Sequence, residues 1–255
     1  MRVRQFVFDT LAIVVALLVN ATATPAAFTP EGCLAMKQKA WGGLRKCEAA
    51  AKAKLLQAGS ADLMKCQTKF QDRISQLTAR AIQGAFSCRY GDGGDGTVTD
   101  YDTGLQWEKK TDDGTVHDKD NTYMWCAGGF PNCTNKPANP PDGSAFTVFL
   151  AMLNNGMSSD GTATNGCFAG HCDWRLPVIE ELRRIGDDTQ GSCGGNAGPC
   201  IDQSVFGPTV EGRYWSASSG AGFSYYAWFV DFADGYESVL DKYLNYSARG
   251  VRSAL

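Results

Sequence analysis

Two stretches near the start of the chain alternate apolar and polar residues at helical spacing. Residues 31–58 and 61–85 each carry apolar side chains three and four positions apart. Gly59-Ser60 separates them, so the pattern predicts two helices that pack antiparallel across a short turn. Cys47 and Cys66 flank the turn, whereas Cys33 and Cys88 lie at the open end. Nested Cys47–Cys66 and Cys33–Cys88 bonds therefore fit a cysteine-stapled helical hairpin over residues 28–88.

The pattern changes at Tyr90–Gly96, a glycine- and aspartate-rich stretch that we interpret as a linker or turn. Beyond it, short strand-like runs alternate with two helical stretches, which predicts an α+β domain over residues 89–255. Asp234-Gly235 is a strong hairpin-turn signal between two of the strands. The expected strands are Gly96–Tyr101, Leu105–Lys109, residues 227–232, Tyr236–Leu240 and Tyr246–Arg252, and the expected helices are Ser144–Asn155 and Pro177–Ile185.

The first 26 residues have the features of a signal peptide. Arg2 and Arg4 precede the apolar run Leu11–Val19, and Ala21-Thr22-Ala23 fits a small-x-small cleavage site. The run is shorter than the ~20 residues that a transmembrane helix needs. We therefore expect an exported protein, located in the periplasm, at the cell surface or in the medium, without a transmembrane anchor after cleavage.

Cysteine content agrees with export. All ten cysteines follow the leader, and an even number in an exported chain predicts five disulfides. The last six form three close pairs. Zinc is disfavoured because the chain has no C-x2-C pair and only two histidines. The cysteines expected in disulfides are Cys33, Cys88, Cys47, Cys66, Cys126, Cys133, Cys167, Cys172, Cys193 and Cys200.

Charge is distributed unevenly along the chain. Residues 28–88 carry 10 Lys and Arg against 4 Asp and Glu, whereas residues 89–255 carry 12 against 22. An acidic main domain disfavours nucleic acid as a partner. The basic hairpin suits an anionic surface or self-association, although a solvated lysine face is the commoner explanation.

Catalytic signatures are missing from the sequence. It lacks the nucleophile elbow G-x-S-x-G, the zinc motif H-E-x-x-H and glycine-rich nucleotide-binding loops. No cysteine follows Cys200, which argues against an oxidoreductase with a late reactive cysteine pair. We therefore expect a protein that is not an enzyme and needs no cofactor.

Two acidic sets resemble calcium-binding loops, although turn formation is favoured for both. The first set is Asp92, Asp95, Asp100 and Asp102, and the second is Asp231, Asp234, Glu237 and Asp241.

Five motifs occur in an order that resembles a known family. They are GTVTDYDTGLQWEKK (Gly96–Lys110), DWRLPVIEEL (Asp173–Leu182), YWSAS (Tyr214–Ser218), AWFVDFADG (Ala227–Gly235) and RGVR (Arg249–Arg252). Together they resemble the Lcl C-terminal domain family, named for the Legionella collagen-like protein. The resemblance implies a C-type-lectin-like fold with two helices, a mixed antiparallel sheet and disulfide-stapled loops. It also implies adhesion or ligand binding. Many relatives have cysteine where this chain has Gly250, so the resemblance implies that one customary disulfide is absent.

In a C-type-lectin-like fold the late strands and loops form the binding face, so the resemblance places recognition there. We expect a glycan or protein ligand to contact the Gly- and Ser-rich loop Ser218–Tyr226 together with Asp234 and Tyr236, while Trp215, Trp228, Val230 and Phe232 form the buried wall. Two alternatives stay open: a structural or assembly role in the cell envelope, and a target-binding protein diversified by a retroelement, because Tyr, Ser, Asn and Asp are frequent near the end. The candidate binding residues are Ser218, Ser219, Phe223, Tyr225, Tyr226, Asp234, Tyr236, Ser238, Asp241, Tyr243 and Asn245.

Overall fold

A computed structural model describes residues 28–58, 62–84, 87–128, 133, 141–155, 166–186, 198–222 and 224–254. The expected signal peptide, the Gly59-Ser60 turn and Phe223 lie outside these residues and stay predictions. None of the helices in the described part combines the length and the apolar character needed to cross a bilayer.

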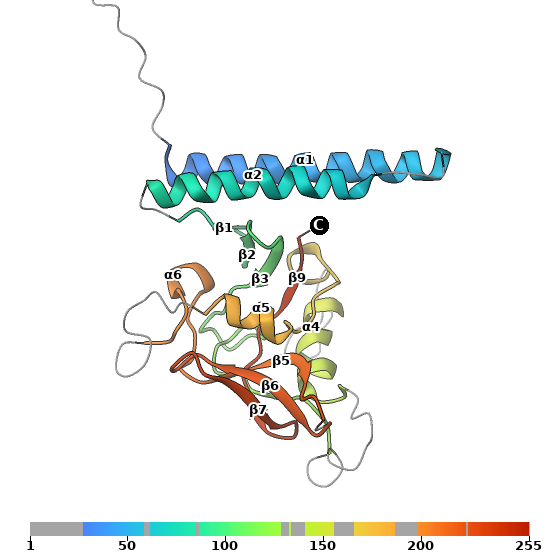
Figure 1. The fold of residues 1–255 in the computed structure, drawn as a ribbon. Helices are drawn as coiled ribbons and strands as arrows, with labels where there is room; N and C mark the ends of the chain where they lie inside the picture. Colours follow the sequence, from blue (N-terminus) through green and yellow to red (C-terminus); the bar gives the residue numbers. More distant parts are fainter. Residues whose placement is uncertain are drawn as a thin grey trace, which may run out of the picture.

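The expected helical hairpin is present. Helix α1 (Pro30–Ala58) and helix α2 (Leu63–Gln83) lie side by side and antiparallel, separate from the sheets (Figure 1). The nested pairing is confirmed, because Cys33 bonds to Cys88 and Cys47 bonds to Cys66. The stripe predicted from residues 61–85 forms the buried face of α2, whose N-terminus is capped by the Asp62 carboxylate.

The first sheet joins strands from both ends of the domain. Its order is β1 (Tyr90–Asp92), β2 (Thr97–Asp100), β3 (Leu105–Glu108) and β9 (Val251–Ser253), all antiparallel. Interpreting Tyr90–Gly96 entirely as a linker or turn was wrong. Tyr90 pairs with Asp100 and its ring packs edge-on against Phe206 at 4.9 Å, so a strand begins there and the turn spans residues 93–96.

The second sheet comes from the final third of the chain. Its order is β5 (Arg213–Ser219), β6 (Tyr226–Asp231) and β7 (Glu237–Asp241), again antiparallel. A short pair, β4 (Tyr123–Met124) and β8 (Asn245–Tyr246), lies beside it. The strand expected over Tyr246–Arg252 is divided between β8 and β9. The intervening residues 247–250 turn inward and are all buried.

Short helices cover the sheets. The helix expected at Ser144–Asn155 begins as a π-helical turn, Ala145–Phe149, and continues as α4 (Leu150–Asn155). Helix α5 (Ile179–Arg184) matches the second predicted helix and packs on β5 and β6. The sequence prediction missed α6 (Gln203–Phe206) and a 3-10 turn at Phe168–Gly170.

The second sheet packs against two cores, one on each of its faces. Trp215, Ala227 and Phe229 belong to one, and Val230 and Phe232 belong to the other, as expected for strand alternation. Trp228 was expected in the wall but is only half-buried, as are all five residues of the neighbouring strand β7.

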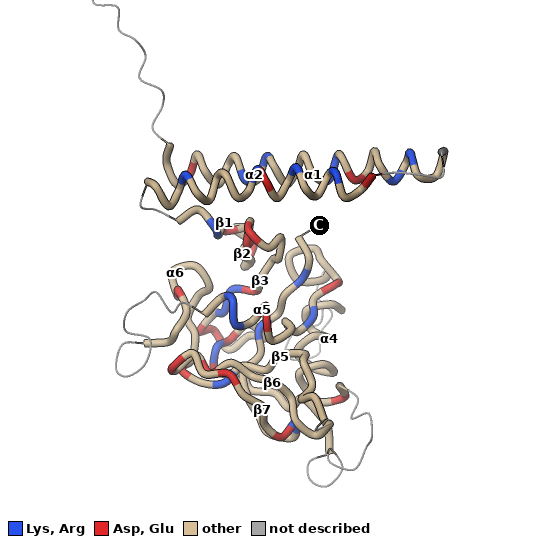
Figure 2. The backbone as a smooth tube through the Cα atoms, viewed as in Figure 1, with Lys and Arg blue, Asp and Glu red and all other residues tan. Residues whose placement is uncertain are grey.

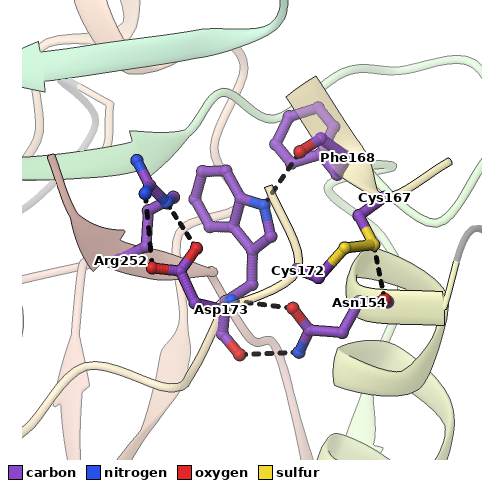
Figure 3. The surroundings of a disulfide bond; sticks show 7 residues. Asn154, Cys167, Phe168, Cys172, Asp173 and Arg252 are labelled. Atoms are coloured by element: carbon purple, nitrogen blue, oxygen red, sulfur yellow. Dashed lines mark hydrogen bonds and ion pairs between the residues drawn. A yellow bond between two sulfur atoms is a disulfide. The ribbon is translucent and has the colours of Figure 1, made fainter. Parts of the chain in front are cut away.

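The segment around Trp174 holds distant parts of the domain together. The Asn154 side chain donates to the Trp174 carbonyl and accepts from the Trp174 N–H, both at 2.7 Å, next to the Cys167–Cys172 disulfide (Figure 3). Asp173 pairs with Arg252 of β9 at 2.7 Å. The Cys126–Cys133 pair is also bonded, whereas Cys193 lies outside the described residues, so its bond to Cys200 stays a prediction.

A charged cluster lies inside the domain. The Glu108 carboxylate is fully buried and accepts from Lys110 Nζ at 3.1 Å, the Gly250 backbone N–H at 2.8 Å and His117 Nδ1 at 2.8 Å. Arg249, also fully buried, donates to the backbone carbonyl of Glu108 at 2.8 Å. This cluster ties β3 to the segment before β9 and explains why the RGVR motif turns inward.

The hairpin is attached to the domain at the turn between β2 and β3. Trp41 of α1 donates from Nε1 to the Tyr101 carbonyl at 2.9 Å, and buried Lys37 pairs with Asp102. Gly104 has a φ of 72°, and a Cβ there would overlap the Trp41 ring. The absence of a side chain at Gly104 is therefore what lets the two parts approach.

Candidate functional site

The late strands bring one group of the expected binding residues together. Tyr226, the first residue of β6, pairs with Asp241, the last residue of β7. Residues 220–222 follow β5, residues 224 and 225 precede β6, and residues 242–244 follow β7. Ser219, which the sequence prediction assigned to a flexible loop, instead ends β5 and is exposed.

Tyrosine side chains gather where β6 begins and β7 ends. The rings of Tyr225 and Tyr226 meet edge to face with centroids 4.4 Å apart. The pKa of the Tyr226 hydroxyl is raised, first by desolvation and then by the nearby Tyr225, Asp241 and Tyr243 side chains. All four residues are half-buried. They form what we call the tyrosine corner: Tyr225, Tyr226, Asp241 and Tyr243.

A buried lysine lies beneath the tyrosine corner. Lys242 is 1% exposed, and its Nζ donates to Ser219 Oγ and to the Ser224 carbonyl, both at 2.7 Å. The ammonium also lies 3.9 Å from the centroid of the Trp125 ring. Burial lowers the pKa of Lys242 to about 8, and no carboxylate in the described residues forms an ion pair with it.

The Lys242 backbone reinforces the same junction. Its N–H donates to the Tyr225 carbonyl, and its carbonyl accepts from the N–H groups of Trp125 and Cys126, all at 3.0 Å. The side chain and the backbone of one residue thus hold the end of β5, residues 224–225 and the Trp125 segment together. A loop fixed in this way offers tyrosine rings and hydroxyl groups in a defined arrangement, which lowers the entropic cost of binding a ligand.

The remaining candidate residues lie elsewhere. Asp234 and Tyr236 lie at the far end of β6, ~17 Å from the tyrosine corner at 3.4 Å per residue. The Ser218 hydroxyl accepts from the N–H of Ile179 at the start of α5. Ser238 pairs with buried Phe229, and Asn245 pairs with Met124. Phe223 lies outside the described residues.

The two acidic sets do not converge in the structure. Asp92 pairs with Lys109, Asp100 with Arg89 and Asp102 with Lys37, while Asp95 accepts from Thr97. In the second set Asp231 pairs with Arg213, Glu237 with Arg183, and Asp234 accepts from the Tyr236 N–H. Each of these carboxylates already has a local partner, which leaves calcium without a prepared set of ligands at either place.

One acidic cluster was not anticipated from the sequence. Asp112, Asp118 and Asp120 place ligand atoms within 4.8 Å of one another. Lys119 pairs with Asp112 at 3.2 Å and with Asp120 at 2.7 Å, which offsets one of the three negative charges.

Sequence reasoning also missed Lys242 and Trp125. The one sequence feature that singles out Lys242 is that it is the only basic residue between Arg213 and Arg249. A lone lysine in an aromatic and acidic stretch usually indicates a solvated position, and only the fold shows that this one is buried. Trp125 gave no signal, since it is distant in sequence from the late strands.

Comparison with known proteins gives one match. The family model described as the Lcl C-terminal domain matches residues 96–252, more than half of the chain. Neither the curated proteins nor the solved structures include a significant match.

Proposed function

Because the chain belongs to the Lcl C-terminal domain family, we propose that it is an exported, non-enzymatic binding protein. We further propose that its domain is C-type-lectin-like and recognises a glycan or a protein through the tyrosine corner. The four disulfides that join described residues are typical of exported proteins, which supports the location.

The observation that carries this proposal is the half-exposed tyrosine corner above buried Lys242. Tyrosine supplies large, rigid contact area at low entropic cost, as it does in antibody binding sites. Asp241 and Ser219 add hydrogen-bonding oxygens at its edge. Aromatic faces next to carboxylate and hydroxyl groups suit an uncharged sugar, and the acidic domain disfavours a polyanionic glycan.

Glycan and protein arrays probed with the chain from residue 27 onward, with and without calcium, test the proposal. We expect Tyr225→Ala/Tyr226→Ala to reduce binding to any ligand found by at least ~10-fold, since removing an aromatic anchor costs more than about 1.4 kcal/mol. Tyr236→Ala is the matched control, because Tyr236 is 60% exposed but lies at the other end of the sheet. Equally weakened binding in both variants, or binding that survives the double substitution, would count against the tyrosine corner.

A structural role in envelope assembly is the second candidate, supported by apolar side chains that the hairpin exposes, among them Leu56 and Met64. Self-association of the chain in solution would favour it. Retroelement diversification of the late strands is a third, and a near-copy of the coding segment that differs only at adenines would support it.

A further inference from the structure

The two helices of the hairpin differ in length beyond the Cys47–Cys66 disulfide. Helix α1 runs about 16 Å past Cys47, whereas α2 begins only about 5 Å before Cys66, at 1.5 Å per residue. The last turns of α1 therefore extend beyond the start of α2 and away from the sheets (Figure 1). We call this region the hairpin tip, residues 51–58 and 62–69.

Apolar side chains are exposed at the hairpin tip. Leu56 is 89% exposed, Met64 is 76% exposed and Leu55 is 43% exposed. Leu55 and Leu56 are exposed because α1 extends past the start of α2, which leaves its end without a helix to pack against, whereas Met64 lies in the first turn of α2. Large apolar side chains scattered singly on a surface need no explanation, but three within one tip indicate a contact site.

Lysines surround these apolar side chains. Lys54, Lys65 and Lys69 line one hollow between the two helices, together with Cys47, Ala51, Asp62 and Cys66. Lys52 is exposed nearby, and the tip holds four lysines against the single acidic residue Asp62. Figure 2 shows that Lys and Arg positions recur along both helices of the hairpin. The Asp62 carboxylate accepts from the N–H of Lys65 as the helix cap. None of the four lysines forms an ion pair with another described residue.

We propose that the hairpin tip binds the surface of an anionic phospholipid bilayer. Leu55, Leu56 and Met64 enter the boundary between headgroups and acyl chains, and the lysine-lined hollow receives a headgroup phosphate. Exposed apolar side chains flanked by lysines are the combination that holds peripheral proteins at such interfaces. A narrow tip suits a soft interface, whereas a stable protein partner requires roughly 800 Å² on each side.

The charge distribution along the chain determines how the protein is oriented on an anionic surface. The segment 28–88 has an excess of 6 positive charges and the segment 89–255 an excess of 10 negative charges. An anionic surface therefore attracts the hairpin and repels the domain. The tyrosine corner belongs to the β5–β6–β7 sheet, which lies on the far side of the domain from the hairpin (Figure 1). Bound by its tip, the protein keeps that corner away from the lipid.

Flotation with vesicles tests the proposal. The chain from residue 27 onward is used, because the apolar leader would itself enter lipid. Vesicles of phosphatidylglycerol and phosphatidylcholine are compared with vesicles of phosphatidylcholine alone. We expect binding to the first only, and weakening as salt is raised, because exposed charges are screened. Inorganic phosphate at matched ionic strength should not release the protein, since it offers no apolar phase.

Two pairs of variants separate the tip from the rest of the hairpin. Leu56→Gln should weaken binding roughly 10-fold, whereas Ile82→Gln, at a 71% exposed position near the base, should not. Lys65→Glu should weaken binding roughly 30-fold, at about fivefold per unit charge, and Lys39→Glu much less. All four positions are exposed, so circular dichroism should confirm unchanged folding.

Three results would overturn the proposal: equal binding to neutral vesicles, no vesicle binding at all, or a dimer of the chain that Leu56→Gln dissociates. The last would assign the tip to a second copy of the chain. None of these results depends on whether the tyrosine corner binds a ligand.

Discussion

Gly104 is the position at which the attachment of the hairpin can be measured most directly. Its φ of 72° disfavours any residue with a Cβ, and that Cβ would overlap the Trp41 ring. Gly114 provides a matched control, because its φ is 75° and nothing lies within 4 Å of the position a Cβ would take. Gly114→Ala therefore carries only the backbone strain, about 1–2 kcal/mol.

Gly104→Ala should cost more, because it also displaces Trp41. Trp41 is 6% exposed, packs on Phe70 with ring centroids 4.2 Å apart and donates to the Tyr101 carbonyl. Truncating a buried tryptophan to alanine costs about 3–5 kcal/mol, which sets an upper limit. The displaced ring would give up a hydrogen bond worth about 1 kcal/mol and part of its packing on Phe70. We therefore expect Gly104→Ala to cost about 2–4 kcal/mol more than Gly114→Ala.

Urea unfolding of the two variants gives this difference, and a double-mutant cycle shows its cause. In a Trp41→Ala background, Gly104→Ala should cost only its backbone strain, because the ring it would strike is gone. If Gly104→Ala costs the same with and without the Trp41 ring, the inference that this contact joins the two parts is wrong. Limited proteolysis at the hairpin adds a second readout, since a detached hairpin is cleaved faster.

Three further predictions concern buried charges and disulfides. Glu108→Gln should lower the free energy of unfolding by about 3–5 kcal/mol, because it leaves a buried lysine unpaired. Burial raises the pKa of Glu108, but the nearby Lys110 and His117 outweigh burial and hold this pKa below the ordinary 4.5. The wild-type chain should therefore lose the stability that ionised Glu108 contributes as the pH falls below 4.5. Acid unfolding of both chains is followed by circular dichroism, and a constant difference in stability between them at every pH would disprove the prediction. Burial lowers the pKa of Lys242 to about 8, so the folded state should gain stability from pH 8 to 10.5, and thermal melts of Lys242→Met should lack that gain. Replacing Cys33–Cys88 by serines should cost about 1 kcal/mol more than replacing Cys47–Cys66, because the sequence separations are 55 and 19; the reverse order in denaturant would refute the loop-entropy reasoning.

The hairpin was predictable in detail because its signals are local. Helical spacing gave both helices, and antiparallel packing then placed Cys47 opposite Cys66 and Cys33 opposite Cys88. The β6–β7 hairpin was equally accessible, since Asp234-Gly235 marks its turn. In these cases sequence neighbours determine the structure, and a single chain carries enough information.

The site was less accessible because it depends on contacts between distant segments. Lys242 is buried only because Trp125 and Ser219 surround it. Glu108 and Arg249 would each be assigned to the surface by their charge, yet they meet in the interior across 141 residues. The sequence prediction placed the 218–226 loop and the pair Asp234 and Tyr236 in one binding surface. The length of β6 separates them in the structure, and that length was not evident from the sequence.

The Cys33–Cys88 bond determines how the molecule would respond to a pulling force. It links residues 55 positions apart, at the start of α1 and just before the domain. Tension applied at residue 28 would therefore pass through one covalent bridge to residue 88, and the intervening residues would carry none of it. A load applied between residue 28 and the domain would therefore leave the helical segments beyond Cys33 folded, because the bridge bypasses them.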